Sequence, residues 1–384
     1  MRNSQTVVLT ALILSQFTAP AHAETAPAPS APAPESTEAA GTHVGGFVEA
    51  AYHANPAQFE ADKPIPLRSY DAYGGNNFIL HSAHLSVAHA ATNRLSAAIE
   101  IDAGQDAGVT SGLGAASGGP EFGWFDVQEA FIKYSTESKF AFTVGKFATY
   151  EGVEVLSGPK NPTLTRGFLF NFAEPFTHVG VKAHYMPDGP LDVGVGVVNG
   201  WDAMLDNNDS KTVIFRVGVT PSPKYIVAFS GSYGAERPQG TGAAGANTDR
   251  RLSLDVTGAV APSDSWVLNF QANYGLEPNV PVDVAANPRL TTDATWLGFG
   301  VQPVYTYSAF SLGGRFEWFS DPQGVRALAP SSGSYMNFTI TPGYAIAQNF
   351  VVRGELRLDT ASQNILTNGK STQTTVALGA HYLF

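Results

Sequence analysis

Several ingredients of an ordinary soluble domain are scarce in this chain of 384 residues. Charged residues make up 14% of the sequence, whereas soluble domains contain about a quarter. Cysteine is absent, so disulfide bonds cannot hold the fold together. No stretch of about twenty residues is continuously apolar, which excludes a transmembrane helix. Low charge, an aromatic content of 11% and the lack of an apolar helix together favour a β-sheet in which apolar and polar side chains alternate.

The start of the chain has the pattern of a secretory signal peptide. Arg2 supplies a positive charge, the short apolar stretch VVLTALILSQFTA follows, and Ala21 and Ala23 form a small-x-small cleavage site. We therefore expect residues 1–23 to be removed on export. Residues 24–41, rich in proline and alanine, have too few large apolar side chains to fold and should form a disordered periplasmic linker. The folded domain would then span residues 42–384.

Polar and apolar residues alternate in many short segments along the rest of the chain. In VVRGELRLD, Leu356 and Leu358 fall on one face of a strand, while Arg353, Glu355, Arg357 and Asp359 fall on the other. About sixteen segments alternate in this way, each with roughly the ten residues that a tilted strand needs to cross a membrane. They lie near residues 44–54, 77–91, 94–104, 125–135, 138–148, 176–186, 190–200, 211–220, 224–234, 249–261, 264–275, 294–307, 309–319, 335–345, 348–359 and 373–384.

The connections between these segments alternate between short and long. Short turns such as 136–138 and 187–189 are followed by long loops such as 149–175 and 276–293. Short turns on one rim and long loops on the other are typical of bacterial outer-membrane barrels. The sequence therefore predicts an all-β protein, a transmembrane antiparallel β-barrel of about sixteen strands. Its short turns would face the periplasm, its long loops would face outward, and its outer surface would contact membrane lipid.

The chain ends in the alternating segment VALGAHYLF, whose last residue is Phe384. In a closed barrel the last strand pairs with the first, which leaves no unpaired edge in the lipid. An aromatic residue at this end would lie at the membrane interface. The segment also resembles the signal that the outer-membrane barrel assembly machinery reads, so Phe384 is expected to serve in assembly.

A longer resemblance covers residues 131–185 and 197–223. These stretches contain a Gly-Lys-Phe strand end, the acidic loop EGVEV, an Asn-Pro pair, the return FAEPFTHVGV and the loop NGWD. In this order of motifs the chain resembles the OmpL-like β-barrel porins. The resemblance implies a passive channel for ions and small hydrophilic solutes in the outer membrane of a Gram-negative cell.

The charged strand residues indicate where water would run through such a barrel. A Lys or Arg that faces lipid at mid-membrane costs roughly 2–4 kcal/mol, so charges on the polar strand faces must point into a wet lumen. With about sixteen strands, that lumen is wide enough to stay aqueous. The expected pore-lining residues are Glu100, Asp102, Glu129, Lys182, Arg216, Arg315, Glu317, Arg353, Glu355, Arg357 and Asp359.

The loop 149–175 is the candidate for a constriction. In general porins, which this barrel resembles, the loop after the fifth strand folds inward and narrows the pore. Here the loop carries Glu151, Glu154, Lys160 and Arg166. If its carboxylates face the arginines across the lumen, a transverse field results. The alternative is that the loop only caps the barrel.

The sequence supports other functions less well than a porin. A substrate-specific channel remains an alternative, and an outer-membrane enzyme or an adhesin is less well supported. His81 and His84 are three residues apart, so on a strand they face opposite sides and cannot share a metal ion. No cofactor motif is present, and the net charge of −11 disfavours nucleic acid. We expect no cofactor or metal, and the barrel could form a homo-oligomer.

Overall fold

The computed structural model describes residues 41–58, 60, 63–116, 123–238, 247–281, 291–327 and 332–384. The expected signal peptide and nearly all of the expected linker, residues 1–40, lie outside the described residues. The first strand begins at Gly41.

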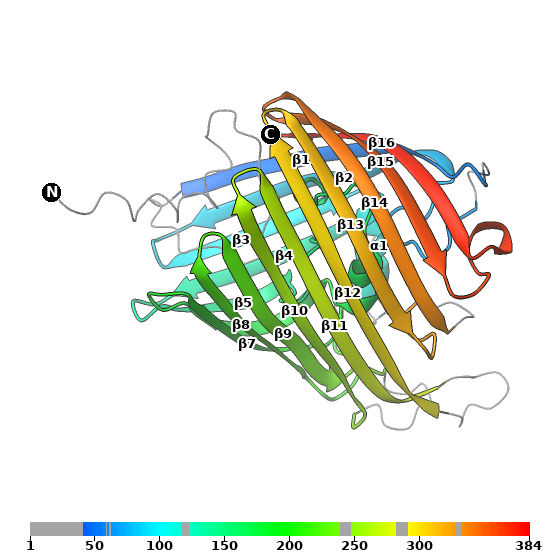
Figure 1. Ribbon diagram of the computed structural model, residues 1–384. Coiled ribbons are helices and arrows are strands. Elements are labelled where there is room, and N and C mark those ends of the chain that lie inside the picture. Colours follow the sequence, from blue (N-terminus) through cyan, green and yellow to red (C-terminus); the bar gives the residue numbers. More distant parts are fainter. Residues whose placement is uncertain are drawn as a thin grey trace.

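The described chain forms sixteen antiparallel strands that close into one barrel, with β1 paired to β16 (Figure 1). The predicted fold class is therefore confirmed. The strands are β1 Gly41–Ala54, β2 Asn76–Ala90, β3 Leu95–Ala103, β4 Phe125–Ser135, β5 Phe140–Ala148, β6 Thr177–Tyr185, β7 Leu191–Val198, β8 Thr212–Ser222, β9 Tyr225–Ala235, β10 Arg250–Ser263, β11 Trp266–Pro281, β12 Thr291–Tyr307, β13 Phe310–Asp321, β14 Gly333–Ala347, β15 Phe350–Ala361 and β16 Thr372–Leu383.

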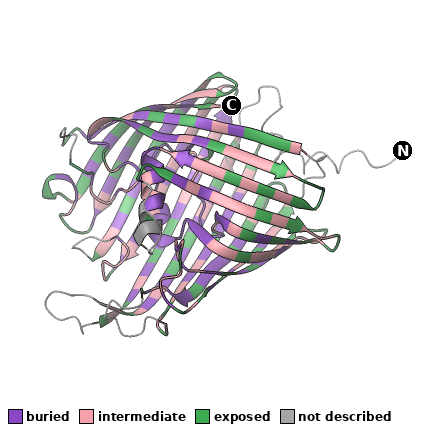
Figure 2. Cartoon of the chain, turned by 180° about the vertical axis from the view of Figure 1, so that it is seen from behind, coloured by how far each residue is buried: buried purple, intermediate pink, exposed green. Residues whose placement is uncertain are grey.

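Side chains alternate between the two faces of the barrel wall, as the period of two requires. On β15, Leu356 and Leu358 are 49% and 38% exposed on the outside, whereas Arg357 and Asp359 between and beside them are fully buried inside. The same banding of buried and exposed residues runs around the wall in Figure 2. An apolar outer face and a polar inner face suit a barrel surrounded by lipid.

The register departs from regular alternation at two bulges in the early strands. In the pairing of β1 with β2, Glu49 lies opposite Ser82 and Ala50 lies opposite Leu80, so His81 is an extra residue. His81 and His84 are both buried inside as a result. The expectation that these two histidines face opposite sides is wrong, because a β-bulge changes which face the following residues occupy. In β4, Gln128 is the extra residue, since Glu129 and Val127 pair with successive residues of β3.

One long connection contains a helix that the sequence pattern did not predict. Helix α1, Gln105–Ala116, follows β3 and packs against β2, β3 and β4. Its Asp106 accepts a hydrogen bond within the barrel at 2.9 Å from Nδ1 of His81. Short helical turns occur at Gly158–Lys160, Leu169–Ala173 and Thr367–Gly369. None of the described helices is long and apolar enough to cross a membrane.

Candidate functional site

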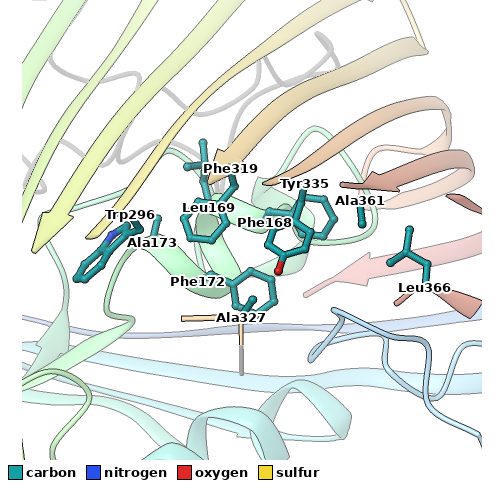
Figure 3. Packing of buried hydrophobic residues seen from close by; sticks show 10 residues of the cluster. All are labelled: Phe168, Leu169, Phe172, Ala173, Trp296, Phe319, Ala327, Tyr335, Ala361 and Leu366. Carbon is teal, nitrogen blue, oxygen red and sulfur yellow. The ribbon is translucent and has the colours of Figure 1, made fainter. Parts of the chain in front are cut away.

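The connection between β5 and β6, residues 149–176, lies inside the barrel. Its segment Leu169–Ala173 brings a cluster of apolar side chains against the inner surface of the wall (Figure 3). Phe168 and Leu169 pack there with Trp296 of β12, Phe319 of β13 and other buried residues. Burial of large apolar side chains stabilises this contact by about 1.5–3 kcal/mol each. The loop thus has a hydrophobic anchor of its own inside a polar lumen.

Polar contacts with β13 hold the middle of the loop. Arg315 donates a hydrogen bond from Nη1 to Oε1 of Glu154 at 2.6 Å and another to the hydroxyl of Thr163 at 2.7 Å. Glu317, two residues along the strand, accepts a hydrogen bond from the backbone N–H of Phe168 at 2.7 Å. The side chains of Arg315, Glu154 and Glu317 are at most 3% exposed. These hydrogen bonds compensate the charged side chains for the water they lose on burial.

The charged residues of β15 also bind the loop backbone. Glu355 accepts a hydrogen bond from the N–H of Leu164 at 2.7 Å, and Arg353 donates to the carbonyl of Asn161 at 2.9 Å. Arg357 donates to the carbonyl of Arg166 at 2.6 Å. Asp359 accepts hydrogen bonds from Arg68 in the loop between β1 and β2, at 2.6 Å from Nη2. All four of these strand residues are covered by loops rather than open to water.

The two ends of the loop lie against β10 and β11. Glu151 accepts a hydrogen bond from the Ser253 hydroxyl, and Glu174 accepts one from Nε2 of Gln271 at 2.6 Å. Burial, and then the nearby carboxylate of Asp255, raise the pKa of Glu151 from the usual 4.5 to about 8. The same two causes raise the pKa of Glu174 well above its usual range. Glu151 therefore contacts serine on β10 rather than the arginines on β13 and β15.

Two glycines on the inner face of the wall make room for the loop. A Cβ atom on Gly313 of β13 would collide with the carbonyl oxygen of Pro162, and one on Gly379 of β16 would lie 2.8 Å from a methyl carbon of Leu164. A side chain at either position would push the loop away from the wall. The wall is therefore shaped for this loop.

Arg166 is buried between aromatic rings. Its guanidinium carbon lies 5.5 Å from the ring centres of both Tyr70 and Phe170, and Nη2 donates to the carbonyl of Leu156 at 2.8 Å. A carboxylate oxygen of Asp106 on α1 lies 3.9 Å from Nη2 of Arg166. Arg166 thus joins the loop to the helix and to the first long loop.

The other expected site residues lie on β3, β4, β6 and β8, except for Lys160, which is in the loop. Asp102 is buried and accepts a hydrogen bond from Gln128 at 3.1 Å, and Arg216 pairs with Asp192 at 2.9 Å. Glu100, Glu129 and Lys182 are partly exposed on the inner face. Lys160, at the end of a helical turn in the loop, is exposed.

A buried chain of polar residues inside the barrel was not predicted from the sequence. The Nε2 atoms of His53 and His81 lie 2.8 Å apart, and His81 contacts Asp106. A second pair, Arg68 and Asp71, is also fully buried. His81 is brought inward by the bulge, and Asp106 and Arg68 come from connections. The alternation of polar and apolar residues predicts neither the position of a bulge nor the contacts of residues in the connections. In the described part of the chain, no group of three or more potential ligands could hold a metal ion.

Comparison with known families decides what this barrel is. The family model described as "Putative beta-barrel porin-2, OmpL-like" matches residues 41–384. The chain belongs to this porin family. The match extends over every described strand, so the resemblance first seen in the middle of the sequence holds for the whole barrel. The protein is accordingly an outer-membrane porin.

Solved structures show the same fold at low sequence identity. The outer membrane channel DcaP of Acinetobacter baumannii aligns with a TM-score of 0.61 at 14% identity, covering 91% of this chain and 99% of that one. The anion-selective porin from Comamonas acidovorans gives 0.59 at 11% identity, covering 90% and 100%. The trimer form of OmpT from Vibrio cholerae gives 0.58 at 14%, covering 90% and 100%. No curated protein matches the sequence.

Proposed function

We propose that this porin is a passive diffusion channel for ions and small hydrophilic solutes, narrowed by the loop 149–176. The observation that carries the proposal is the fixed position of the loop, which is bonded to β13 and β15 through Glu154, Leu164 and Arg166. A segment held at so many points reduces the cross-section permanently instead of covering the mouth from outside.

Single-channel recording tests this proposal. Refolded protein in a planar bilayer should give stable conductance steps, and replacement of residues 152–173 by a short Gly-Ser linker should enlarge the steps. Heat-modifiable migration of both proteins on gels would confirm that both barrels are folded. Equal steps in the two proteins would show that the loop is outside the conducting path, and the absence of steps in the native protein would contradict the channel itself.

We propose a channel role rather than an enzymatic one. The arrangement closest to a catalytic group is the chain of His53, His81 and Asp106, since two imidazoles and a carboxylate are in contact. These residues are at most 4% exposed. A solute in the lumen would not reach them, and their position between β1, β2 and α1 supports a structural role.

We also propose that Phe384 serves as the assembly signal and that the outer wall contacts lipid. The backbone N–H and carbonyl of Phe384 each form a hydrogen bond with Gly46 at 3.0 Å, which closes the barrel at its last residue.

On the outer surface of the barrel, a groove of about 420 Å³ lies over β4–β7 and is lined by apolar residues such as Ile132, Val181 and Val195. Such a surface suits acyl chains or a second copy of the barrel, and cross-linking in membranes distinguishes the two.

A further inference from the structure

The later part of the connection between β1 and β2, residues 63–75, also folds into the barrel. Ile65 and Tyr70 in this segment are both 2% exposed, and the side chain of Arg68 is fully buried. Connections ordinarily run over the surface of a protein, where a charged side chain remains in water. Burial of a cation here shows that the segment is held against other parts of the barrel.

Arg68 fixes this segment to the inner wall of β15 and β16. Its Nη2 donates hydrogen bonds to Oδ2 of Asp359 at 2.6 Å and to the hydroxyl of Thr375 at 3.1 Å, and its Nε donates to the same Asp359 oxygen at 3.1 Å. Asp71, in the segment itself, accepts a hydrogen bond from Nη1. The side chains of the three charged residues are at most 1% exposed, so they are compensated by one another and not by water.

The backbone adopts an unusual conformation just before Arg68. Leu67 has a φ of 58°, in the left-handed region that residues other than glycine rarely adopt. In this conformation Leu67 packs against the hydrophobic cluster of Figure 3, which includes Phe168 and Leu169 of the loop after β5. Such a conformation persists only where the surrounding structure holds it, and it is common in segments that clamp or switch.

Tyr70 makes the main aromatic contact with the loop after β5. Its ring centre lies 5.3 Å from that of Phe170 and 5.7 Å from that of Phe176, edge to face in both pairs, which is a favoured geometry. The hydroxyl of Ser69 beside it donates a hydrogen bond to Oδ1 of Asn171. The segment therefore supports the same part of the loop that packs on the wall in Figure 3.

Tyr70 also joins the segment to α1. Its carbonyl oxygen accepts a hydrogen bond at 2.7 Å from Nε2 of Gln105, the first residue of the helix. Three inward segments thus meet at Tyr70, namely residues 63–75, the helix and the loop after β5. Arg68 attaches this junction to the wall.

We propose that residues 63–75 form a brace that holds the loop after β5 in its narrowing position, so that two connections set the bore of the channel. Arg68 and Tyr70 are the positioning residues of this brace, since the first fixes it to the wall and the second supports the loop. This inference rests on the proposed channel function. Release of the brace removes contacts from Phe170 and Asn171, and a segment with fewer buried contacts opens more often. A channel without the brace should therefore be wider on average and noisier.

Single-channel recording of Arg68→Gln and Tyr70→Ala tests the brace. Both variants should show a larger conductance step and more open-channel noise than the native protein. Tyr70→Phe is the matched control, because the Tyr70 hydroxyl has no hydrogen-bond partner among the described residues, and it should keep the native step and noise. Arg94→Gln, on an exposed turn, is the control for the loss of an arginine. Heat-modifiable migration on gels identifies the folded barrels.

A reversible cross-link gives a second measurement after folding is complete. Because the native chain has no cysteine, Ser69→Cys with Asn171→Cys places two thiols where the brace contacts the loop. A short bis-methanethiosulfonate should join them in the folded protein. In Arg68→Gln the cross-link should restore the native step and noise, and reduction should remove the effect. Ser69→Cys with Ser138→Cys, on an exposed turn of the opposite rim, should not cross-link.

The outcomes separate the brace from the channel. Folded Arg68→Gln and Tyr70→Ala with native step and noise would overturn the brace and leave the channel function standing, as would a failure of the pair 69 and 171 to cross-link in native-like channels. If Arg68→Gln does not fold, Tyr70→Ala with the same cross-link decides the question. A native protein without conductance would contradict the channel function first.

Discussion

The carboxylate of Glu154 and the guanidinium of Arg315 meet at 2.6 Å in the interior of the barrel, with side chains 3% and 0% exposed. The first belongs to the loop after β5, and the second to β13, more than 150 residues later in the chain. Two charges removed from water must be paired with each other or with other polar groups. This buried ion pair is therefore one of the polar links between the loop and the wall.

Loss of one partner should destabilise the barrel strongly. Arg315→Gln leaves Glu154 buried without its cation, and removing one partner of a buried pair costs about 3–5 kcal/mol. The double change to Glu154→Gln and Arg315→Gln should cost less than the sum of the two single changes. Urea unfolding in lipid vesicles measures all three. The exposed pair Arg94 and Glu137, 42% and 82% exposed, is the control, where glutamine should change stability by at most about 1 kcal/mol. Additive losses at 154 and 315 would contradict the coupling.

A side chain at Gly313 should displace the loop. Gly313→Val puts methyl groups where the carbonyl of Pro162 lies, so the loop must leave this part of the wall and the conductance step should rise. The control is Gly354→Val on β15, where the nearest atom to a new Cβ is 4.0 Å away. That valine should leave the conductance unchanged. If Gly313→Val behaves like Gly354→Val, the loop does not narrow the path at this depth.

Docking of the loop should weaken as the pH rises. The pKa of Glu151 lies at about 8 instead of its usual 4.5, because burial favours the neutral carboxyl. The docked loop therefore holds a proton that the released loop would lose. Its stability is fully present below about pH 4.5 and is lost as the pH rises through about 8.

Conductance recorded across this pH interval measures the effect. The native channel should become larger or noisier toward alkaline pH as the loop loosens. Glu151→Gln keeps a neutral side chain and should reduce the change, and the addition of Glu174→Gln should reduce it further because burial raises that pKa as well. Glu137→Gln, on an exposed turn, should keep the full dependence. A native channel with no change over this interval would show that docking does not depend on these protons.

The strands were predictable from the sequence, and the packing inside them was not. Leu356 and Arg357 alternate because neighbouring residues of a strand face opposite sides, and that pattern alone predicted their sides and the sixteen strands. The contact of Arg315 with Glu154 depends on how a loop folds back into the lumen, which no local periodicity records. Likewise His81 faces inward only because of a bulge. The sequence therefore predicted which strand residues face inward. Which of them are covered by loops, such as Arg315 and Arg357, and which are partly exposed, such as Glu100 and Lys182, required the structure.

Removal of the last residue should separate assembly from stability. The backbone of Phe384 forms two hydrogen bonds with Gly46, and a Cβ on Gly46 would lie 2.7 Å from the Phe384 ring, so the ring covers the seam between β1 and β16. Deletion of Phe384 removes both the bonds and the ring, whereas Phe384→Ala keeps the backbone. If the ring is the assembly signal, both variants should reach the outer membrane in smaller amounts and accumulate as periplasmic fragments. Purified Phe384→Ala should nevertheless refold into vesicles nearly as well as the native protein. Phe384→Tyr, which retains an aromatic ring, is the control and should assemble normally in cells. Normal outer-membrane levels of Phe384→Ala would show that the ring is an interfacial residue only, since the barrel then closes in the cell without an aromatic ring at its last residue.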